Sequence, residues 1–258
     1  MMFMSEPQPS GPFEWTQAAG GRTLRCPPLL VYAPHFFTTR DLTLRDDAEW
    51  TRVAAAMDVD RPGLRMIRQV HGVDVAVVRA GSGPGWTSPE ADVIVSDDPD
   101  SAIVVRVADC APVLFADTRL GVVAAAHAGW RGAAQGVAPA AVNALHDHFG
   151  SQPRDLIAAI GPCLGVCCGE VGPEVVEAFA SAGHSRADIE RWFRPGEGDR
   201  FYLDLAAASA GQLAAAGVPP DHIHVSGLCT KSYPQLFHSY RAHGRAAGRL
   251  AAVIRRKN

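Results

Sequence analysis

Three residues in this sequence carry side chains that commonly bind a soft metal ion: His71 in QVHG, Cys110 in ADCAP and His127 in AHAGWRG. Two imidazoles and one thiolate suit zinc, and catalytic zinc typically keeps three protein ligands and a fourth position open to water or substrate. The three residues lie far apart and fit no short-loop ligand pattern, so spacing alone leaves their convergence open. The alternatives are that Cys110 is a small buried apolar residue and that His127 is a hydrogen-bonded core histidine.

Asp109 places a carboxylate in the apolar segment VRVADCAPVLFAD, where we expect Pro112 to interrupt a buried strand just after the cysteine. A carboxylate is rarely left unpaired in a core, so its partner should be Arg131, a histidine ring N–H or backbone N–H groups. Hydrogen bonding to a metal-bound histidine would satisfy it. Asp109 would then orient a ligand or move a proton.

Arg131, in HAGWRG, is a candidate phosphate ligand. Its guanidinium is a planar charged fork, and a helix starting near Gly132 would add free backbone N–H groups. If Pro139 marks the first turn of the helix instead, Arg131 lies on a loop. A structural ion pair with Asp109 or Asp117 is the competing interpretation.

The segment GPCLGVCCGE, residues 161–170, contains three more cysteines: Cys163 and the adjacent pair Cys167 and Cys168. On a strand, Cys167 and Cys168 would point to opposite faces, which disfavours chelation of one ion. We therefore expect buried thiols beside a tight glycine turn.

The elements that must position these residues follow from the residue patterns. The segment LRMIRQVHGVDVAVV (64–78) predicts a strand pair around His71, and the segment from Asp109 to Trp130 predicts a hairpin that turns at DTRLG. Apolar residues at every fourth position from Val137 to Phe149 predict a helix. This irregular order favours an α+β (mixed α/β) fold, with mixed sheets flanked by helices, over a doubly wound parallel sheet. We expect a loosely ordered segment over residues 1–28 and one domain over residues 29–258.

The composition excludes several classes of protein. A net charge of −3 gives no basic field for nucleic acid, and no uninterrupted apolar stretch reaches the length of a membrane helix. Without a recognisable leader, the expected compartment is the cytoplasm. Six cysteines in 258 residues are too few for a disulfide scaffold, so thiols or metal ligands are expected.

Taken in order, several motifs resemble the signature of the YfiH family, also known as laccase-domain or polyphenol oxidase proteins. The similarity spans residues 64 to about 250 and is carried by QVHGVDV, ADCAPVLFAD, HAGWRG, IGPCLGVCCGEVGPEV, LDL and CTKSYPQLFHSYRAHGRAAGRL. The resemblance implies one mixed α/β domain, with one zinc held by His71, Cys110 and His127. It also implies a fold similar to that of toxin deamidases with a Cys/His pair.

The resemblance further implies a purine nucleoside phosphorylase acting on adenosine, inosine, guanosine and methylthioadenosine, with adenosine deaminase activity. The expected partners are therefore a small nucleoside and phosphate, the latter bound by Arg131 and Arg40. A metal-free hydrolase or amidase of a cell-wall precursor, with Cys110 as nucleophile and His127 as base, is the alternative. Copper-dependent phenol oxidation is weaker, because a four-copper site needs about ten ligands and only two His-x-His pairs occur, His146/His148 and His222/His224. A closed structural zinc site in a binding protein is the non-enzymatic alternative.

The sequence departs from the family pattern near the expected substrate. Arg40 is kept in FFTTRDLTLRDD, but the glycines usual in that segment are absent. Gly169 stands where an aromatic residue is usual, and His238 replaces the second of two phenylalanines. These departures predict a different wall of the substrate pocket.

Overall fold

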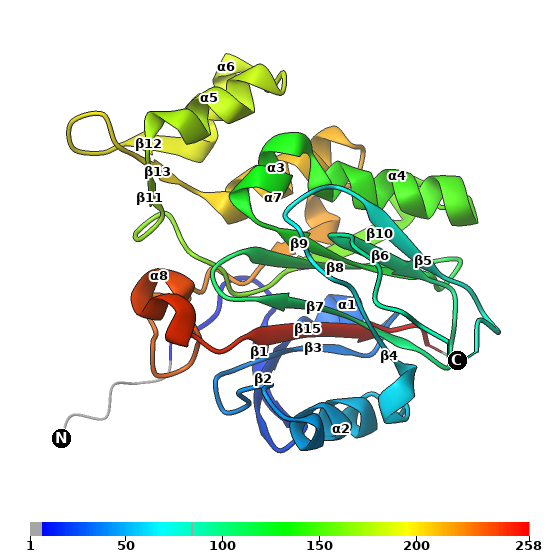
Figure 1. Ribbon diagram of the computed structural model, residues 1–258. Helices are drawn as coiled ribbons and strands as arrows, with labels where there is room; N and C mark the ends of the chain where they lie inside the picture. Colours follow the sequence, from blue (N-terminus) through cyan, green and yellow to red (C-terminus); the bar gives the residue numbers. More distant parts are fainter. Residues whose placement is uncertain (1–6, 84, 258) are drawn as a thin grey trace.

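Two six-stranded sheets packed face to face form the centre of the computed structural model, which describes residues 7–83 and 85–257 (Figure 1). The first sheet has the order β1 (Glu14–Ala18), β2 (Gly21–Arg25), β3 (His35–Thr38), β15 (Leu250–Arg255), β7 (Ala102–Val107), β4 (Leu64–Met66). The second has the order β14 (Ile223–Val225), β10 (Leu156–Ile160), β8 (Ala111–Asp117), β9 (Val123–Ala128), β6 (Val93–Ser96), β5 (Val75–Val78). Both sheets mix parallel and antiparallel pairs, as β4 with β7 and β15 with β7 illustrate.

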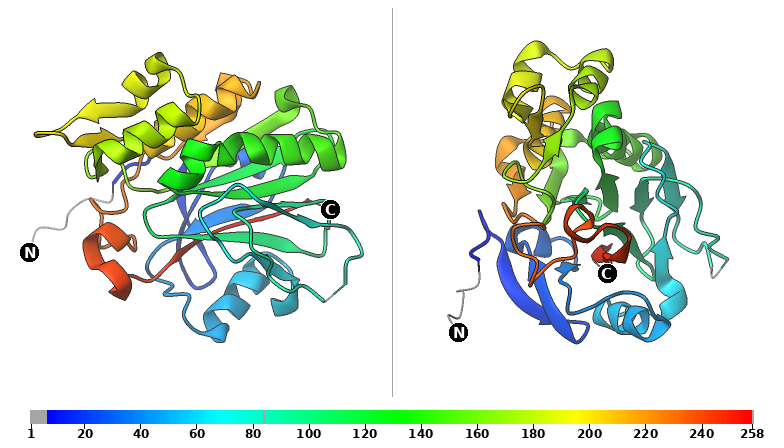
Figure 2. Two further views of the ribbon diagram at one scale, coloured as in Figure 1. Left: turned by 45° about the horizontal axis from the view of Figure 1, so that its top comes forward. Right: turned by 60° about the vertical axis from the view of Figure 1, so that its left-hand side comes forward.

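Helices cover the two outer faces, so the molecule has four layers (Figure 2). Helix α2 (Asp47–Ala56) packs on the first sheet. The second sheet is covered by α3 (Trp130–Gln135), α4 (Val137–Phe149) and α7 (Leu205–Ala215). A small sheet of β11 (Glu170–Val171), β13 (Phe201–Leu203) and β12 (Phe193–Pro195) extends from one end with α5 (Pro173–Ser181) and α6 (Arg186–Trp192). The mixed α+β architecture agrees with the sequence-based prediction.

The alternation of side chains along β8 explains the layering. Leu114 and Ala116 point into the core between the sheets, whereas Val113 and Phe115 pack against the helices on the other face. Because successive side chains of a strand face opposite sides, a strand buried on both faces is apolar throughout. Complete burial of a Leu or Phe side chain contributes about 1.5–3 kcal/mol.

The structure corrects two predicted strands. β4 and β5 do not pair with each other: β4 pairs with β7 in the first sheet and β5 with β6 in the second. The segment VRVADCAPVLFAD likewise contains β7 of the first sheet and β8 of the second, and Pro112 lies inside β8 rather than ending it. Residues 67–74 and 108–110 are therefore two crossovers between the sheets. Alternation of apolar residues predicts a strand, but it does not predict which sheet the strand joins.

Two further segments differ in detail from the expectation. Residues 14–25 form the paired strands β1 and β2, because Trp15 and Leu24 add to the core between the sheets. Residues 1–6 of the expected loose segment lie outside the described residues. The predicted helix is confirmed as α4, but it follows a separate short helix, α3, and Gly136 at φ 85° joins the two. Of the helices in the described ranges, none has the length and apolar character needed to cross a bilayer.

Candidate metal centre

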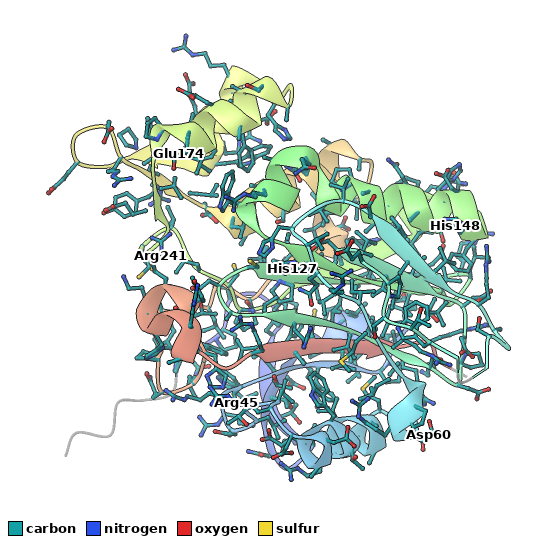
Figure 3. All side chains as sticks on the ribbon, viewed as in Figure 1. Arg45, Asp60, His127, His148, Glu174 and Arg241 are labelled. Carbon is teal, nitrogen blue, oxygen red and sulfur yellow. The ribbon has the colours of Figure 1, made fainter. Side chains whose placement is uncertain are left out.

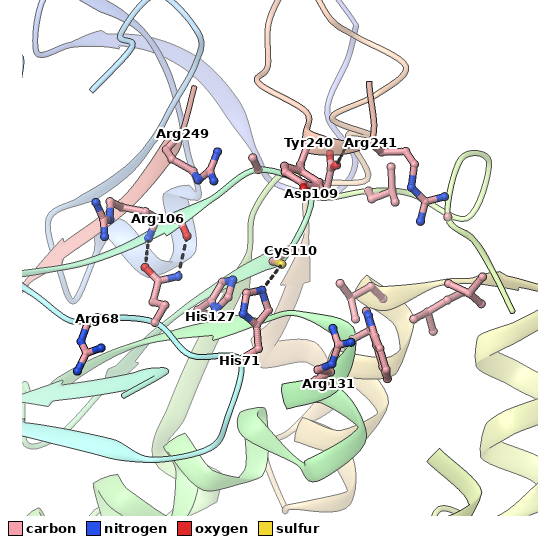
Figure 4. Close-up of a pocket in the computed structure, with 18 residues that line it drawn as sticks. Arg68, His71, Arg106, Asp109, Cys110, His127, Arg131, Tyr240, Arg241 and Arg249 are labelled. Carbon is pink, nitrogen blue, oxygen red and sulfur yellow. Dashed lines mark hydrogen bonds between the residues drawn. The ribbon is translucent and has the colours of Figure 1, made fainter. Parts of the chain in front are cut away.

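The structure brings together the three residues whose convergence the sequence left open. His71 lies on the first crossover, Cys110 ends the second, and His127 lies near the end of β9 (Figure 4). Their ligand atoms all lie within 4.8 Å of one another. The Cys110 Sγ atom is 3.9 Å from His71 Nε2, and the two imidazole centroids are 4.8 Å apart. His127 is buried and His71 is exposed, so the group opens to one side.

Asp92, which directly precedes β6, organises both histidines. Its Oδ1 accepts a hydrogen bond from His127 Nδ1 at 2.7 Å, and the carboxylate also accepts from the backbone N–H groups of Val70, His71 and Gly72 at 2.7–3.1 Å. Burial alone would raise the pKa of Asp92, but these hydrogen bonds lower it. An ionised Asp92 fixes the proton of His127 on Nδ1 and leaves Nε2 to face the site.

Sequence reasoning missed Asp92. The available signal was an acidic residue at the start of the buried strand ADVIVSD, a position that requires partners. Those partners are the His127 ring, 35 residues later, and backbone N–H groups about twenty residues earlier, which no side-chain pattern indicates.

The backbone around His71, Cys110 and His127 adopts conformations that bring the three donor atoms together. His71 and Asp109 have φ values of 64° and 91°, a region that residues other than glycine rarely adopt. A Cβ atom on Gly129 would lie 2.7 Å from His71 Cδ2 and 3.0 Å from Cys110 Sγ. Only glycine therefore lets the end of β9 approach the crossovers closely enough for the three donors to meet. The donor set itself, two imidazoles and a thiol, suits zinc or copper.

The electrostatics of the group favour a thiolate. Burial would raise the pKa of Cys110, but hydrogen bonds and positive charge from His127 and His71 lower it to about 6. Burial would lower the pKa of His127, but Asp92 and the Cys110 thiolate raise it to about 9. Near pH 7 the metal-free pair is thus a thiolate beside an imidazolium. The thiolate is the form that binds metal or attacks an electrophile.

A cavity of about 770 Å³ adjoins the three donors and is rich in arginine. Its lining includes five guanidinium groups, those of Arg68, Arg106, Arg131, Arg241 and Arg249 (Figure 4). Arg68 pairs with Glu90 at 2.6 Å, whereas Arg106, Arg131 and Arg249 form no ion pair within the described ranges. Burial and the nearby charge of Arg249 lower the pKa of Arg106. This wall of the cavity is suited to an anion.

The other predicted site residues are placed as follows. Arg131, on α3, lines the cavity with its guanidinium 4.2 Å from the Trp130 ring centroid. Arg40 is not among the described residues of the cavity wall, and its guanidinium donates to the Pro234 carbonyl. Of the other two departures from the family pattern, Gly169 lines the cavity, whereas His238 is not among the described lining residues.

Asp109 has partners that differ from those expected. It accepts hydrogen bonds from Thr230 Oγ1 at 2.6 Å and from the backbone N–H of Arg241 at 2.5 Å, and it contacts neither Arg131 nor a histidine ring. Arg241, labelled in Figure 3, belongs to α8 (Tyr240–His243) and lines the cavity (Figure 4). Asp109 therefore ties the second crossover to the C-terminal segment.

Comparison with known proteins identifies the family of this chain. Residues 37–257 match the family described as multi-copper polyphenol oxidoreductase laccase. The chain belongs to this laccase family. The resemblance to YfiH proteins is thereby confirmed.

Relatives of this laccase-family chain include a protein named purine nucleoside phosphorylase from Deinococcus radiodurans, 35% identical, with 92% of this chain and 94% of the relative aligned. A protein named adenosine deaminase RL5, from an unknown prokaryotic organism, is 36% identical over 82% of this chain and 81% of its own. The crystal structure of the hypothetical protein YfiH from Bacillus licheniformis is similar over 96% of this chain and 100% of that one, with a TM-score of 0.86 and 26% identity.

Proposed function

We propose that this chain is a zinc-dependent purine nucleoside phosphorylase that also deaminates adenosine. The observation that carries the proposal is the convergence of His71, Cys110 and His127 at the edge of an arginine-rich cavity of about 770 Å³. The relatives named purine nucleoside phosphorylase and adenosine deaminase supply the reaction class. Adenosine, inosine, guanosine and methylthioadenosine are the proposed nucleosides, and the cytoplasm is the proposed compartment.

His71, Cys110 and His127 would hold the zinc ion, and copper is the alternative metal for the same donors. A bound zinc ion would supply Lewis-acid chemistry at the cavity. Asp92 accepts a hydrogen bond from His127 Nδ1–H, which would hold the proton on the side of the ring away from a bound ion. Gly129 leaves room for the His71 ring beside the thiolate.

The arginines of the cavity support a phosphate site. Arg106, Arg131 and Arg249 line the cavity and have no carboxylate partner among the described residues, so their charges are available to an anionic ligand. They replace Arg40 in the proposed site, since the Arg40 guanidinium faces Pro234. Binding phosphate there would place a nucleophilic oxygen beside the nucleoside and within reach of the metal centre.

Asp109 is the one carboxylate among the described residues that line the cavity. Both of its oxygens already accept short hydrogen bonds, from Thr230 and Arg241. With both oxygens engaged in this way, Asp109 is held in place and positions the adjacent Cys110.

The direct test is to incubate purified, zinc-loaded protein with adenosine, with and without inorganic phosphate. Phosphorolysis would consume phosphate and release adenine and ribose 1-phosphate, whereas deamination would consume water and release inosine and ammonia. Removing the metal should abolish both activities, and reloading with zinc or with copper identifies the active ion. Absence of turnover of any purine nucleoside by the zinc-loaded protein would refute the proposal.

A second candidate function rests on the metal-free state of the same group. Cys110, His127 and Asp92 form a thiolate, an imidazolium and an orienting carboxylate, the arrangement of a cysteine hydrolase or amidase. Cys110 Sγ would attack an acyl carbon, and His127 would donate its proton to the leaving amine. A cell-wall precursor amide is the candidate substrate. Amide hydrolysis that survives metal removal but not alkylation of Cys110 would favour this function.

A further inference from the structure

A second group of sulfur atoms lies apart from the metal centre, and we call Cys167, Cys168 and Cys229 the three-cysteine cluster. Their Sγ atoms all lie within 4.8 Å of one another. Cys167 and Cys168 lie in a turn closed by the hydrogen bond from Cys168 N–H to the Gly165 carbonyl at 2.9 Å, not on the strand that the sequence suggested. A turn lets adjacent cysteines face the same side, which removes the objection to shared coordination.

The backbone holds the two halves of the cluster together. Cys163 and Cys229 form an isolated parallel bridge, in which Cys163 N–H donates to the Leu228 carbonyl and Thr230 N–H to the Cys163 carbonyl. A Cβ atom on Gly165 would lie 3.1 Å from Cys229 Cβ, so a side chain there would crowd the cluster. The close approach of the turn to Cys229 is therefore built into the fold.

Hydrogen-bond donors point at the sulfur atoms. Gly165 N–H donates to Cys229 Sγ at 3.3 Å, and the Ser232 hydroxyl lies 3.4 Å from Cys167 Sγ and 3.5 Å from Cys168 Sγ. Burial would raise the pKa of Cys229, but Ser232 and Gly165 lower it. Burial and the neighbouring sulfurs raise the pKa of Cys167 to about 11. One thiolate is thus favoured, and further thiolates need a cation to relieve their repulsion.

We propose that Cys167, Cys168 and Cys229 form a second metal site, for Zn²⁺ or Cu⁺, with the Ser232 hydroxyl or water as an additional ligand. In a tetrahedral zinc site with Zn–S bonds of about 2.3 Å, neighbouring sulfurs lie about 3.8 Å apart. Sulfur atoms already within 4.8 Å reach that spacing through side-chain movements of about an ångström or less. Thiolate donors select these ions over Mg²⁺ and Ca²⁺.

The cluster is connected to the wall of the cavity. The Arg241 guanidinium donates to the Cys168 carbonyl at 3.5 Å and to the Glu170 carbonyl at 2.8 Å, and Gly169 between them lines the cavity. An ion at the cluster would therefore fix the segment that forms this wall. It would act on the substrate only through the position of the wall.

The test uses full-length protein and Co²⁺ as a spectroscopic substitute for zinc, under reducing, oxygen-free conditions. Cys110→Ser removes the only thiolate of the first site, so any sulfur-to-cobalt charge-transfer band in that variant must come from another site. We expect this variant to keep such a band, saturating at one Co²⁺ per chain. Adding Cys167→Ser and Cys229→Ser to the Cys110→Ser variant should eliminate the band. Adding Cys163→Ala to Cys110→Ser instead is the control and should preserve the band.

The proposal would be overturned by absence of the band from a folded Cys110→Ser variant, or by persistence of the band without Cys167 and Cys229. A disulfide within the cluster that survives the reductant, detected by counting free thiols, would also overturn it. If replacing buried Cys229 prevents folding, Cys110→Ser with Cys167→Ser alone suffices, because Cys167 is exposed. That variant should bind Co²⁺ about tenfold or more weakly than Cys110→Ser.

Discussion

Asp92 supports the proposed metal centre without being one of its donors. We expect Asp92→Asn to weaken zinc binding by about 10- to 100-fold, because the amide cannot stabilise the Nδ1 proton of His127 as a carboxylate does. Zinc affinity is measured by competition with a coloured chelator. Asp97→Asn, at the far end of β6, is the control and should leave the affinity unchanged; equal affinities for the two variants would contradict the role of Asp92.

Gly129 gives a second test at this scale. Gly129→Ala places a Cβ atom 2.7 Å from His71 Cδ2, so His71 must move and the zinc affinity and turnover should fall together. Circular dichroism should show an intact fold, since the clash is confined to the site. Gly85→Ala is the matched control because nothing lies within 4 Å of its added Cβ. Normal zinc binding by Gly129→Ala would argue against close packing of the donors.

The proposed phosphate site predicts a specific kinetic effect. Arg106→Gln should raise the KM for phosphate by about tenfold or more, with a smaller change in the KM for nucleoside, because a charged hydrogen bond contributes about 1.5–3 kcal/mol. Arg68→Gln is the control, since Arg68 is already paired with Glu90. Equal effects of both substitutions on phosphate would place the anion elsewhere.

The sequence singled out the three proposed metal donors by residue type, but it could not place the residues that support them. His71, Cys110 and His127 carry their chemistry in their side chains, which the sequence displays directly. Asp92 acts through the His127 ring and through backbone N–H groups of a distant loop, and backbone groups leave no signature in the sequence. The phosphate assignment of Arg40 rested on the family resemblance, whereas its contact with Pro234 depends on the path of the C-terminal segment.

At the scale of the elements, the sequence predicts where strands occur but not which strands pair with each other. β4 and β5 are separated by only eight residues and look like a hairpin, yet they join different sheets. Their apolar residues satisfy either sheet, because both are buried on two faces. The hairpin of β8 and β9 was predictable, since DTRLG supplies a turn between two apolar runs.

His35, on β3, connects the first sheet to α1 (Pro27–Leu30) through two hydrogen bonds and makes stability depend on pH. Cys26 N–H donates to His35 Nε2 at 3.0 Å and His35 Nδ1–H donates to the Ala33 carbonyl at 2.9 Å, so the folded state holds the neutral ring. Burial lowers the pKa of His35 from 6.5 to about 4. Stability from this group is therefore fully present above pH 6.5 and is lost as the pH falls towards 4.

We expect the loss to reach up to about 3 kcal/mol between these pH values. Urea unfolding at pH 7 and pH 4.5 measures it, with His35→Gln as the reference that cannot titrate. The wild type should lose more stability than the variant over this interval. An identical loss in both proteins would show that His35 is not the responsible group.

At the scale of the whole molecule, the proposed metal donors would join the two crossovers between the sheets, which carry His71 and Cys110, to strand β9 of the second sheet, which carries His127. Zinc that binds the folded but not the unfolded chain should stabilise the protein by about 4 kcal/mol when free zinc is a thousandfold above its Kd. Calorimetry with and without a chelator measures the change in Tm. In His71→Ala, zinc binding at the first site should hardly change the Tm. A wild-type Tm that does not change with metal would contradict the coupling between zinc binding and folding stability.

The two crossovers have a consequence for how the protein matures. Each runs from the first sheet to the second, and the donors meet only when both crossovers have reached their final paths. In a partly folded chain with only one sheet formed, the three donor atoms would lie far apart and would bind the ion weakly. Metal loading is thus expected to be among the last steps of biogenesis, and a cell starved of zinc should accumulate this protein folded and empty rather than unfolded.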